Sequence, residues 1–145
     1  MLDVGAKLAA GLEAGDIVYL NGPLGAGKTT LTRGVLRALG YTTTVSSPTY
    51  AMVEEYDLAN FTLYHFDGYR LHNEEEWLDM GVDDYLHDKA VCLIEWPDTG
   101  LTVLPQATMT IDIALSECGR DVTVTLSQSE RDLLSSCLKE CLACR

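Results

Sequence analysis

Positive charge is scarce in this chain. Of its 145 residues only 10 are Lys or Arg, against 22 Asp or Glu, so the formal net charge is −12. Binding to nucleic acid draws on cations that replace the counterions condensed on the phosphates, so the deficit argues against a domain that grips nucleic acid directly. A single anion can still be held by backbone N–H groups, and a small phosphate ligand therefore stays open.

Targeting and membrane signals are also missing. Residues 1–5 carry no basic stretch followed by a long apolar core, so the sequence does not predict secretion. The longest fully apolar runs, such as residues 90–94, are far too short to cross a bilayer. Five cysteines, an odd number, favour reduced thiols in a chain without a signal. We expect a cytoplasmic protein.

Repeats, low-complexity stretches and linkers rich in Pro, Gly or Ser are absent, so we expect one domain over residues 1–145. The share of hydrophobic residues, 47%, is that of an ordinary globular protein and argues against disorder. Neither N-K-x-D nor D-x-x-G occurs, which disfavours a GTPase, and no cluster of arginines suggests the lid of a small-molecule kinase.

The hydrophobic pattern predicts strands that alternate with helices, and therefore an α/β domain with a mixed β-sheet. The expected helices cover residues 7–12, 28–39 and 74–80, the last capped by Asn73 and ended by Gly81. The expected strands cover residues 17–20, 50–56, 61–67 and 90–94, and a C-terminal hairpin pairs 109–115 with 122–126. A capping-box pattern at Ser127 predicts a final helix to Cys144.

The sequence GPLGAGKT at residues 22–29 matches G-x-x-x-x-G-K-[ST] between an expected strand and an expected helix. Glycines allow successive N–H groups to turn inward, and the helix directs its positive end at the same anion. Lys28 can reach the β- and γ-phosphates, and the Thr29 hydroxyl can bind Mg²⁺. The alternative is an ordinary glycine-rich turn. The residues of this motif expected at the nucleotide are Gly22, Gly25, Ala26, Gly27, Lys28 and Thr29.

Glu95 follows the buried strand 90–94, which is where a nucleotide-binding protein places a metal-holding acid. The carboxyl ends of parallel strands face the ligand crevice, so we expect Glu95 to meet the glycine-rich segment there. An exposed acid at a strand end is the alternative. Trp96 could stack on a base, although an aromatic residue in this place is more often part of the core.

Two further segments carry candidate chemistry. The segment SSPTY can lend the Thr49 hydroxyl to Mg²⁺ and the γ-phosphate, or it is simply a proline turn. In the segment HFDGYR, Asp67 could orient or deprotonate an attacking water, and Arg70 could face phosphate oxygens. A surface ion pair is the alternative for these two residues, and His65 is expected to be packed rather than catalytic.

The motifs GPLGAGKTT, SSPTY, HFDGYRL and LIEWP, in this order, resemble the TsaE family, whose older names are YjeE and YdiB. The resemblance extends roughly from Val4 to Ile113. It implies a P-loop NTPase-like three-layer domain that binds ATP or ADP with Mg²⁺. It also implies an ATPase that acts on the TsaB–TsaD pair in making threonylcarbamoyladenosine at position 37 of tRNAs. Turnover by the isolated chain would be slow, because a partner can complete the site.

Carried across position by position, the resemblance implies roles for further residues. Residues 25–30 would bind ATP, with Lys28 also acting in catalysis, and Trp96 would contact the nucleotide. Thr29 and Glu95 would hold Mg²⁺. Thr49 would act as a switch residue and Asp67 as the acid that activates water.

The sequence departs from the family pattern at two positions inside these motifs. Pro23 stands where the family usually has Asp, and Gly68 stands where it usually has Leu. Neither side chain is needed for the chemistry of the phosphate cradle.

Alternatives remain open at the level of function. The chain could be a nucleotide-dependent binding module with negligible hydrolysis, or a small-molecule P-loop kinase. Between residues 73 and 88 there are seven acidic side chains and no Lys or Arg, which is either a solvated face or a surface for a basic partner. Cys137, Cys141 and Cys144 have the spacing of an iron–sulfur site, but on a helix they favour packing.

Overall fold

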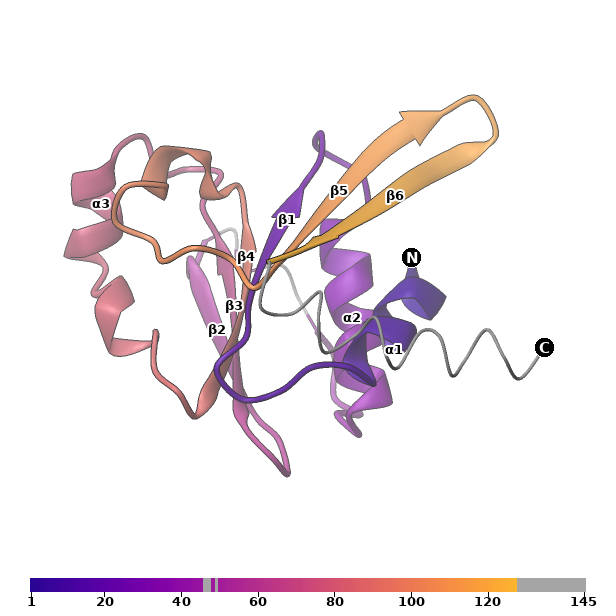
Figure 1. The fold of residues 1–145 in the computed structure, drawn as a ribbon, viewed down its shortest axis with the longest axis horizontal. Coiled ribbons are helices and arrows are strands. Elements are labelled where there is room, and N and C mark those ends of the chain that lie inside the picture. Colours follow the sequence, from indigo (N-terminus) through magenta and orange to yellow (C-terminus); the bar gives the residue numbers. More distant parts are fainter. Residues whose placement is uncertain (46–47, 49, 128–145) are drawn as a thin grey trace.

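A computed structural model describes residues 1–45, 48 and 50–127 (Figure 1). Its sheet has six strands in the order β2-β3-β4-β1-β5-β6, with parallel pairing from β3 to β5 and an antiparallel strand at each edge. The strands are β1 (Ile17–Asn21), β2 (Val53–Asp57), β3 (Thr62–Asp67), β4 (Ala90–Glu95), β5 (Met109–Ser116) and β6 (Gly119–Leu126). The predicted mixed sheet is confirmed.

Helices cover both faces of the sheet and make three layers (Figure 1). One face carries α1 (Leu2–Ala9) and α2 (Lys28–Ala38). The other carries α3 (Glu74–Asp79) and the 3₁₀ turns η1 (Val82–Asp84) and η2 (Pro97–Gly100). Successive residues of β4 enter different cores, since Leu93 packs below α1 and α2 and Ile94 packs below α3. All of β4 is buried, as expected for a central parallel strand with both faces covered.

The first helix differs from the prediction, because it begins at Leu2 and ends at Ala9 instead of covering residues 7–12. Gly5 lies in its interior, which a helix tolerates at a cost of about 1 kcal/mol. The packing explains the glycine: a Cβ on Gly5 would lie 2.1 Å from the carbonyl oxygen of Leu31. A Cβ on Gly34 would similarly lie 2.2 Å from the carbonyl oxygen of Leu2. Close contact between α1 and α2 therefore overrides local propensity.

The strand expected from residue 50 begins only at Val53. Met52, just before it, has φ 66°, in the left-handed region, and this breaks the extended run. The carbonyl of Met52 accepts a hydrogen bond of 2.9 Å from the backbone N–H of Asp67, so the irregular residue still joins β3.

Other boundaries fall on the predicted residue or beside it, except that β6 already begins at Gly119. The cap of α3 is confirmed, because the Asn73 side chain accepts a hydrogen bond of 3.0 Å from the N–H of Glu76. The predicted final helix, with Cys137, Cys141 and Cys144, lies outside the described residues.

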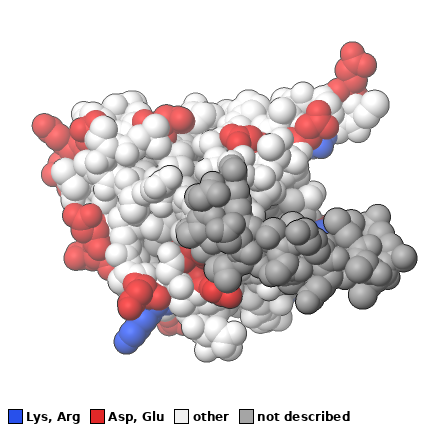
Figure 2. Space-filling view, in the orientation of Figure 1, with Lys and Arg blue, Asp and Glu red and all other residues white. Residues whose placement is uncertain are grey.

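The acidic stretch after residue 73 forms one side of the molecule. Figure 2 shows acidic side chains along the edge where α3 lies. The exposed members are Glu74, Glu75, Asp79, Asp83, Asp84 and Asp88. Across the parts of the chain that the structure describes, no helix has the length and apolarity needed to cross a membrane.

The contact between α1 and α2 can be tested with Gly34→Ala. The added Cβ would meet backbone at 2.2 Å and push α1 away. We expect a loss of about 2 kcal/mol in the free energy of unfolding, measured in urea, despite the better helix propensity of Ala. Gly11→Ala is the matched control, because its Cβ would have no neighbour closer than 3.8 Å. Equal stability of the two variants would contradict the close packing.

Candidate functional site

Residues 22–27, here called the glycine loop, connect the end of β1 to the first residue of α2. Gly22, Gly25 and Gly27 have φ values of 155°, 78° and 108°, which residues other than glycine rarely adopt. Within the loop, the N–H of Ala26 donates to the carbonyl of Pro23 at 3.0 Å. The loop is thus a compact turn that ends at a helix N-terminus, the arrangement that binds anions through backbone N–H groups.

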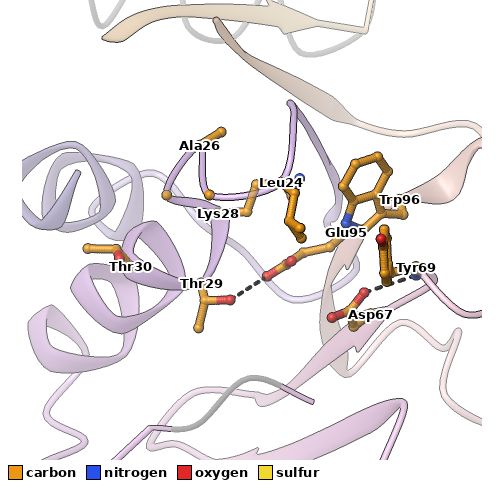
Figure 3. Close-up of a pocket in the computed structure, with 11 residues that line it drawn as sticks. Leu24, Ala26, Lys28, Thr29, Thr30, Asp67, Tyr69, Glu95 and Trp96 are labelled. Carbon is orange, nitrogen blue, oxygen red and sulfur yellow. Dashed lines mark hydrogen bonds between the residues drawn. The ribbon is translucent and has the colours of Figure 1, made fainter. Parts of the chain in front are cut away.

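The glycine loop borders a cavity of about 290 Å³ (Figure 3). The cavity lies at the carboxyl ends of the parallel strands, where β3 and β4 supply its other walls. Its lining residues are Leu24, Gly25, Ala26, Gly27, Lys28, Thr29, Thr30, Asp67, Tyr69, Glu95 and Trp96. Most of the residues expected at the nucleotide therefore surround one space. Gly22 does not line it, and Thr49 lies outside the described residues.

Lys28 is held at the inner end of the glycine loop. Its ammonium donates to the carbonyl oxygens of Gly22 and Pro23, the latter at 3.3 Å. It also lies 3.8 Å from the ring centroid of Trp96. Burial lowers the pKa of Lys28, and the carboxylates of Glu95, Asp67 and Asp98 oppose that shift. These contacts hold the Lys28 ammonium beside the loop, so the side chain does not extend into solvent.

Glu95 is buried, with 3% of its surface exposed, so it is not a surface acid at a strand end. Its Oε1 accepts a hydrogen bond of 3.1 Å from the Thr29 hydroxyl (Figure 3). The same oxygen lies 2.7 Å from Nε2 of His65, which is fully buried. His65 is thus packed, as expected, but its contact is with the predicted metal-holding acid.

Asp67 and Glu95 are paired neighbours in the parallel register of β3 and β4. Asp67 is also buried, and its Oδ1 accepts a hydrogen bond of 3.0 Å from the backbone N–H of Tyr69. Arg70, which the sequence suggested for phosphate oxygens, is not among the residues that line the cavity. It is exposed, and its guanidinium lies 4.5 Å from the ring centroid of Tyr50.

Two residues other than glycine have positive φ within the described residues, and both adjoin this site. Trp96 has φ 55° immediately after Glu95, and Met52 bonds to the backbone of Asp67. For bulky side chains such backbone conformations cost about 1–3 kcal/mol each and cluster at functional sites. In Trp96 the turn brings the indole to the cavity wall, over Lys28.

The structure explains Gly68, which departs from the family pattern. A Cβ at Gly68 would lie 2.5 Å from the carbonyl oxygen of Trp96 and 2.4 Å from Cζ2 of Trp77. The Trp77 ring, fully buried, fills the space that a leucine at position 68 would need. Its Nε1 donates to the Thr99 hydroxyl at 3.0 Å. Through Trp77, α3 packs beside Gly68, directly after Asp67 at the end of β3 and next to the backbone of Trp96.

Sequence reasoning did not assign Leu24 and Tyr69 to the cavity, and it left His65 in the core. A signal was present for His65, because His65 and Asp67 are two residues apart and side chains on a strand alternate in direction. Tyr69 follows Asp67 just beyond the strand, where its direction depends on the hydrogen bond between them.

The donor atoms at the site fit magnesium. Among the described residues, no three side chains of His, Cys, Asp or Glu converge as a metal site. Thr29 and Glu95 instead offer two oxygen donors side by side. Mg²⁺ typically takes one or two protein oxygen ligands together with waters and substrate phosphates. This pair suits that ion better than a metal that needs a full set of protein ligands.

A glycine loop that leads from a central parallel strand into a helix characterises the P-loop α/β proteins, and this chain has that fold. Within that class, the chain belongs to the TsaE family. The sequence model of the family described as "Threonylcarbamoyl adenosine biosynthesis protein TsaE" matches residues 1–122.

Individual proteins agree with this placement. A protein of Haemophilus influenzae named tRNA threonylcarbamoyladenosine biosynthesis protein TsaE is 46% identical over 127 residues, covering 84% of this chain and 80% of that protein. The Bacillus subtilis protein of the same name is 40% identical over 131 residues, covering 89% and 82%. The crystal structure of B. subtilis YdiB superposes with a TM-score of 0.78 at 33% identity, covering 96% of this chain and 86% of that one.

Whether the Trp77 ring occupies the space that a side chain at position 68 would need can be tested by a double-mutant cycle. Gly68→Leu alone should cost about 2–3 kcal/mol through overpacking, and Trp77→Leu alone about 3 kcal/mol through the cavity it leaves. In the double variant the leucine at position 68 can enter the vacated space. We therefore expect the double loss, measured in urea, to fall short of the sum by at least ~1 kcal/mol. Additive losses would contradict this relief and leave the carbonyl oxygen of Trp96, 2.5 Å from the added Cβ, as the main obstacle to a side chain at position 68.

Proposed function

We propose that this chain binds ATP or ADP with Mg²⁺ in the cavity beside the glycine loop and hydrolyses ATP slowly. We further propose that it does so as the ATPase component of the machinery for threonylcarbamoyladenosine at position 37 of tRNA, acting in the cytoplasm on the TsaB–TsaD pair. The observation that carries the nucleotide proposal is the contact of 3.1 Å between Thr29 and Glu95 next to the loop. Membership of the TsaE family supports the pathway.

Binding would use the backbone more than side chains. The N–H groups of residues 25–30 and the first turn of α2 would hold the phosphates, since a helix N-terminus carries partial positive charge. Lys28 would exchange one of its loop carbonyls for a β- or γ-phosphate oxygen. Because Lys28 lies on the Trp96 ring, its movement would change the surroundings of the indole and couple Trp96 to the bound nucleotide.

Hydrolysis would depend on the two buried acids. Thr29 and Glu95 would hold Mg²⁺, which neutralises charge that develops on the phosphates during transfer. His65 keeps Oε1 of Glu95 in place. Asp67, at the adjacent strand end, would orient or deprotonate the attacking water, and Thr49 would respond to the γ-phosphate as a switch residue.

Turnover would be slow without a partner. Among the described lining residues Lys28 is the only cation, and P-loop enzymes gain several orders of magnitude from an added arginine. The same lack of a second cation also favours a second candidate function, a nucleotide-dependent binding module with negligible hydrolysis. The kinase alternative gains no support, because no arginine lines the described cavity.

The nucleotide proposal can be tested with Lys28→Ala. Removing the ammonium takes away the positive charge at the inner end of the loop, so ATP and ADP affinity should fall at least about tenfold. Calorimetry measures the affinity, and circular dichroism checks that the variant is folded. Lys7→Ala, on the exposed side of α1, is the control. Unchanged affinity in Lys28→Ala would refute the site.

Binding and hydrolysis can be separated with the two acids. Asp67→Asn should leave ATP binding intact but lower hydrolysis by about 10²–10⁴-fold, if Asp67 acts as the general base. Glu95→Gln should instead raise the Mg²⁺ concentration needed for half-maximal turnover. Both rates are measured with and without TsaB and TsaD. If Asp67→Asn hydrolyses ATP as fast as the wild type, Asp67 is not the general base. If the wild type hydrolyses no ATP with or without TsaB and TsaD, the chain is a binding module and not an ATPase.

A further inference from the structure

Arg120, at the start of β6, contacts the glycine loop although 94 positions separate it from Ala26. Its Nε donates to the carbonyl of Ala26 at 2.5 Å, and its Nη2 donates to the carbonyl of Gly25 at 3.2 Å. Gly25 and Ala26 line the cavity, whereas Arg120 does not. The guanidinium therefore contacts the loop through two carbonyl oxygens without lining the cavity.

The strand that precedes Arg120 also supports the glycine loop. Asn21 donates from Nδ2 to Oδ1 of Asp112 at 3.0 Å, in the last paired position of β1 and β5. Directly beyond it, a Cβ on Gly22 would lie 2.8 Å from the carbonyl oxygen of Ile113. The hairpin of β5 and β6 thus touches the start of the loop through β5 and its middle through Arg120.

The contact to Ala26 fixes the orientation of one peptide group. A trans peptide is planar, so its N–H points opposite to its carbonyl. The carbonyl of Ala26 faces Arg120, and the N–H of Gly27 is therefore directed away from Arg120. Gly27 itself lines the cavity. Glycine imposes little steric restriction on such a peptide, so Arg120 adds a restraint that the glycine backbone does not supply by itself.

We propose that Arg120 is a positioning residue for phosphate binding, which holds the peptide between Ala26 and Gly27 with its N–H toward the anion. The inference rests on the proposed nucleotide site. When a hydrogen-bond donor is already oriented, none of the binding free energy is lost in reorienting it as the ligand binds. Because coupling between two sites is reciprocal, a bound nucleotide also stabilises the contact of Arg120 and with it the edge hairpin.

The hairpin suits this reciprocal effect. Most residues of β6 are exposed, and in the described chain β6 pairs only with β5. Such an edge element opens at low free energy, so added stabilisation is visible in hydrogen exchange. A purely structural role for Arg120 predicts no dependence of hairpin exchange on nucleotide.

The test compares Arg120→Ala, Arg120→Gln and Arg120→Lys with Arg37→Ala, an exposed arginine in the last turn of α2. Calorimetry measures ADP and ATP affinity, and hydrogen exchange measures protection of residues 109–126 with and without ADP. We expect both neutral variants to bind about tenfold more weakly, the loss of a charge-assisted hydrogen bond. They should also lose the ADP-dependent protection. Arg120→Lys should recover part of the affinity, and Arg37→Ala should match the wild type.

The outcomes separate this inference from the nucleotide proposal. If the wild type binds neither ATP nor ADP, both fall. If the wild type binds and the neutral Arg120 variants bind equally well, with the same protection, only the positioning role falls. Full recovery by Arg120→Lys would also overturn it, because one ammonium supplies the charge without holding two carbonyls in a fixed plane.

Discussion

The structure of the site depends on the orientation of the peptide groups in the glycine loop. A loop whose N–H groups are to face one anion must direct several carbonyl oxygens elsewhere, and those oxygens need donors. Lys28 supplies a donor to the carbonyls of Gly22 and Pro23, and Arg120 supplies donors to those of Gly25 and Ala26. In a chain with only 10 basic residues, two act on this single turn.

Parallel pairing brings the remaining chemistry to the same place. The register sets Asp67 beside Glu95 at the ends of β3 and β4, and both carboxylates are buried. A buried carboxylate is costly unless it is paired or hydrogen-bonded. Glu95 has both the Thr29 hydroxyl and the His65 ring, while Asp67 accepts from the backbone of Tyr69. The surroundings thus hold both acids in fixed positions at the cavity, which a surface ion pair would not achieve.

The parts of this structure that local sequence determines were predictable. A strand, a glycine loop and a helix in succession have a local pattern, and the cap of α3 at Asn73 needs only the next three residues. The unpredicted features depend on tertiary contacts. Gly5 lies in a helix because α2 approaches it, Gly68 has Trp77 in the adjacent space, and Arg120 reaches a loop far away in sequence. Trp77 is near Gly68 in sequence, but no periodic pattern links the two. The partners of Gly5 and Arg120 lie outside any short window, so the prediction for α1 was wrong.

Two elements that reach the surface also contact residues around the cavity. One is α3, which covers a face of the sheet, and the other is the hairpin of β5 and β6 at the edge of the sheet. The buried Trp77 ring belongs to α3, whose surface is acidic, and lies beside Gly68, which directly follows Asp67. Arg120 lies between the edge hairpin and the glycine loop. By linkage, any molecule that binds α3 or the hairpin more tightly when the cavity is filled must raise affinity in the cavity by the same factor. Trp77 and Arg120 are the described contacts that join these two surfaces to the residues around the cavity, and packed contacts of this kind resist gradual deformation.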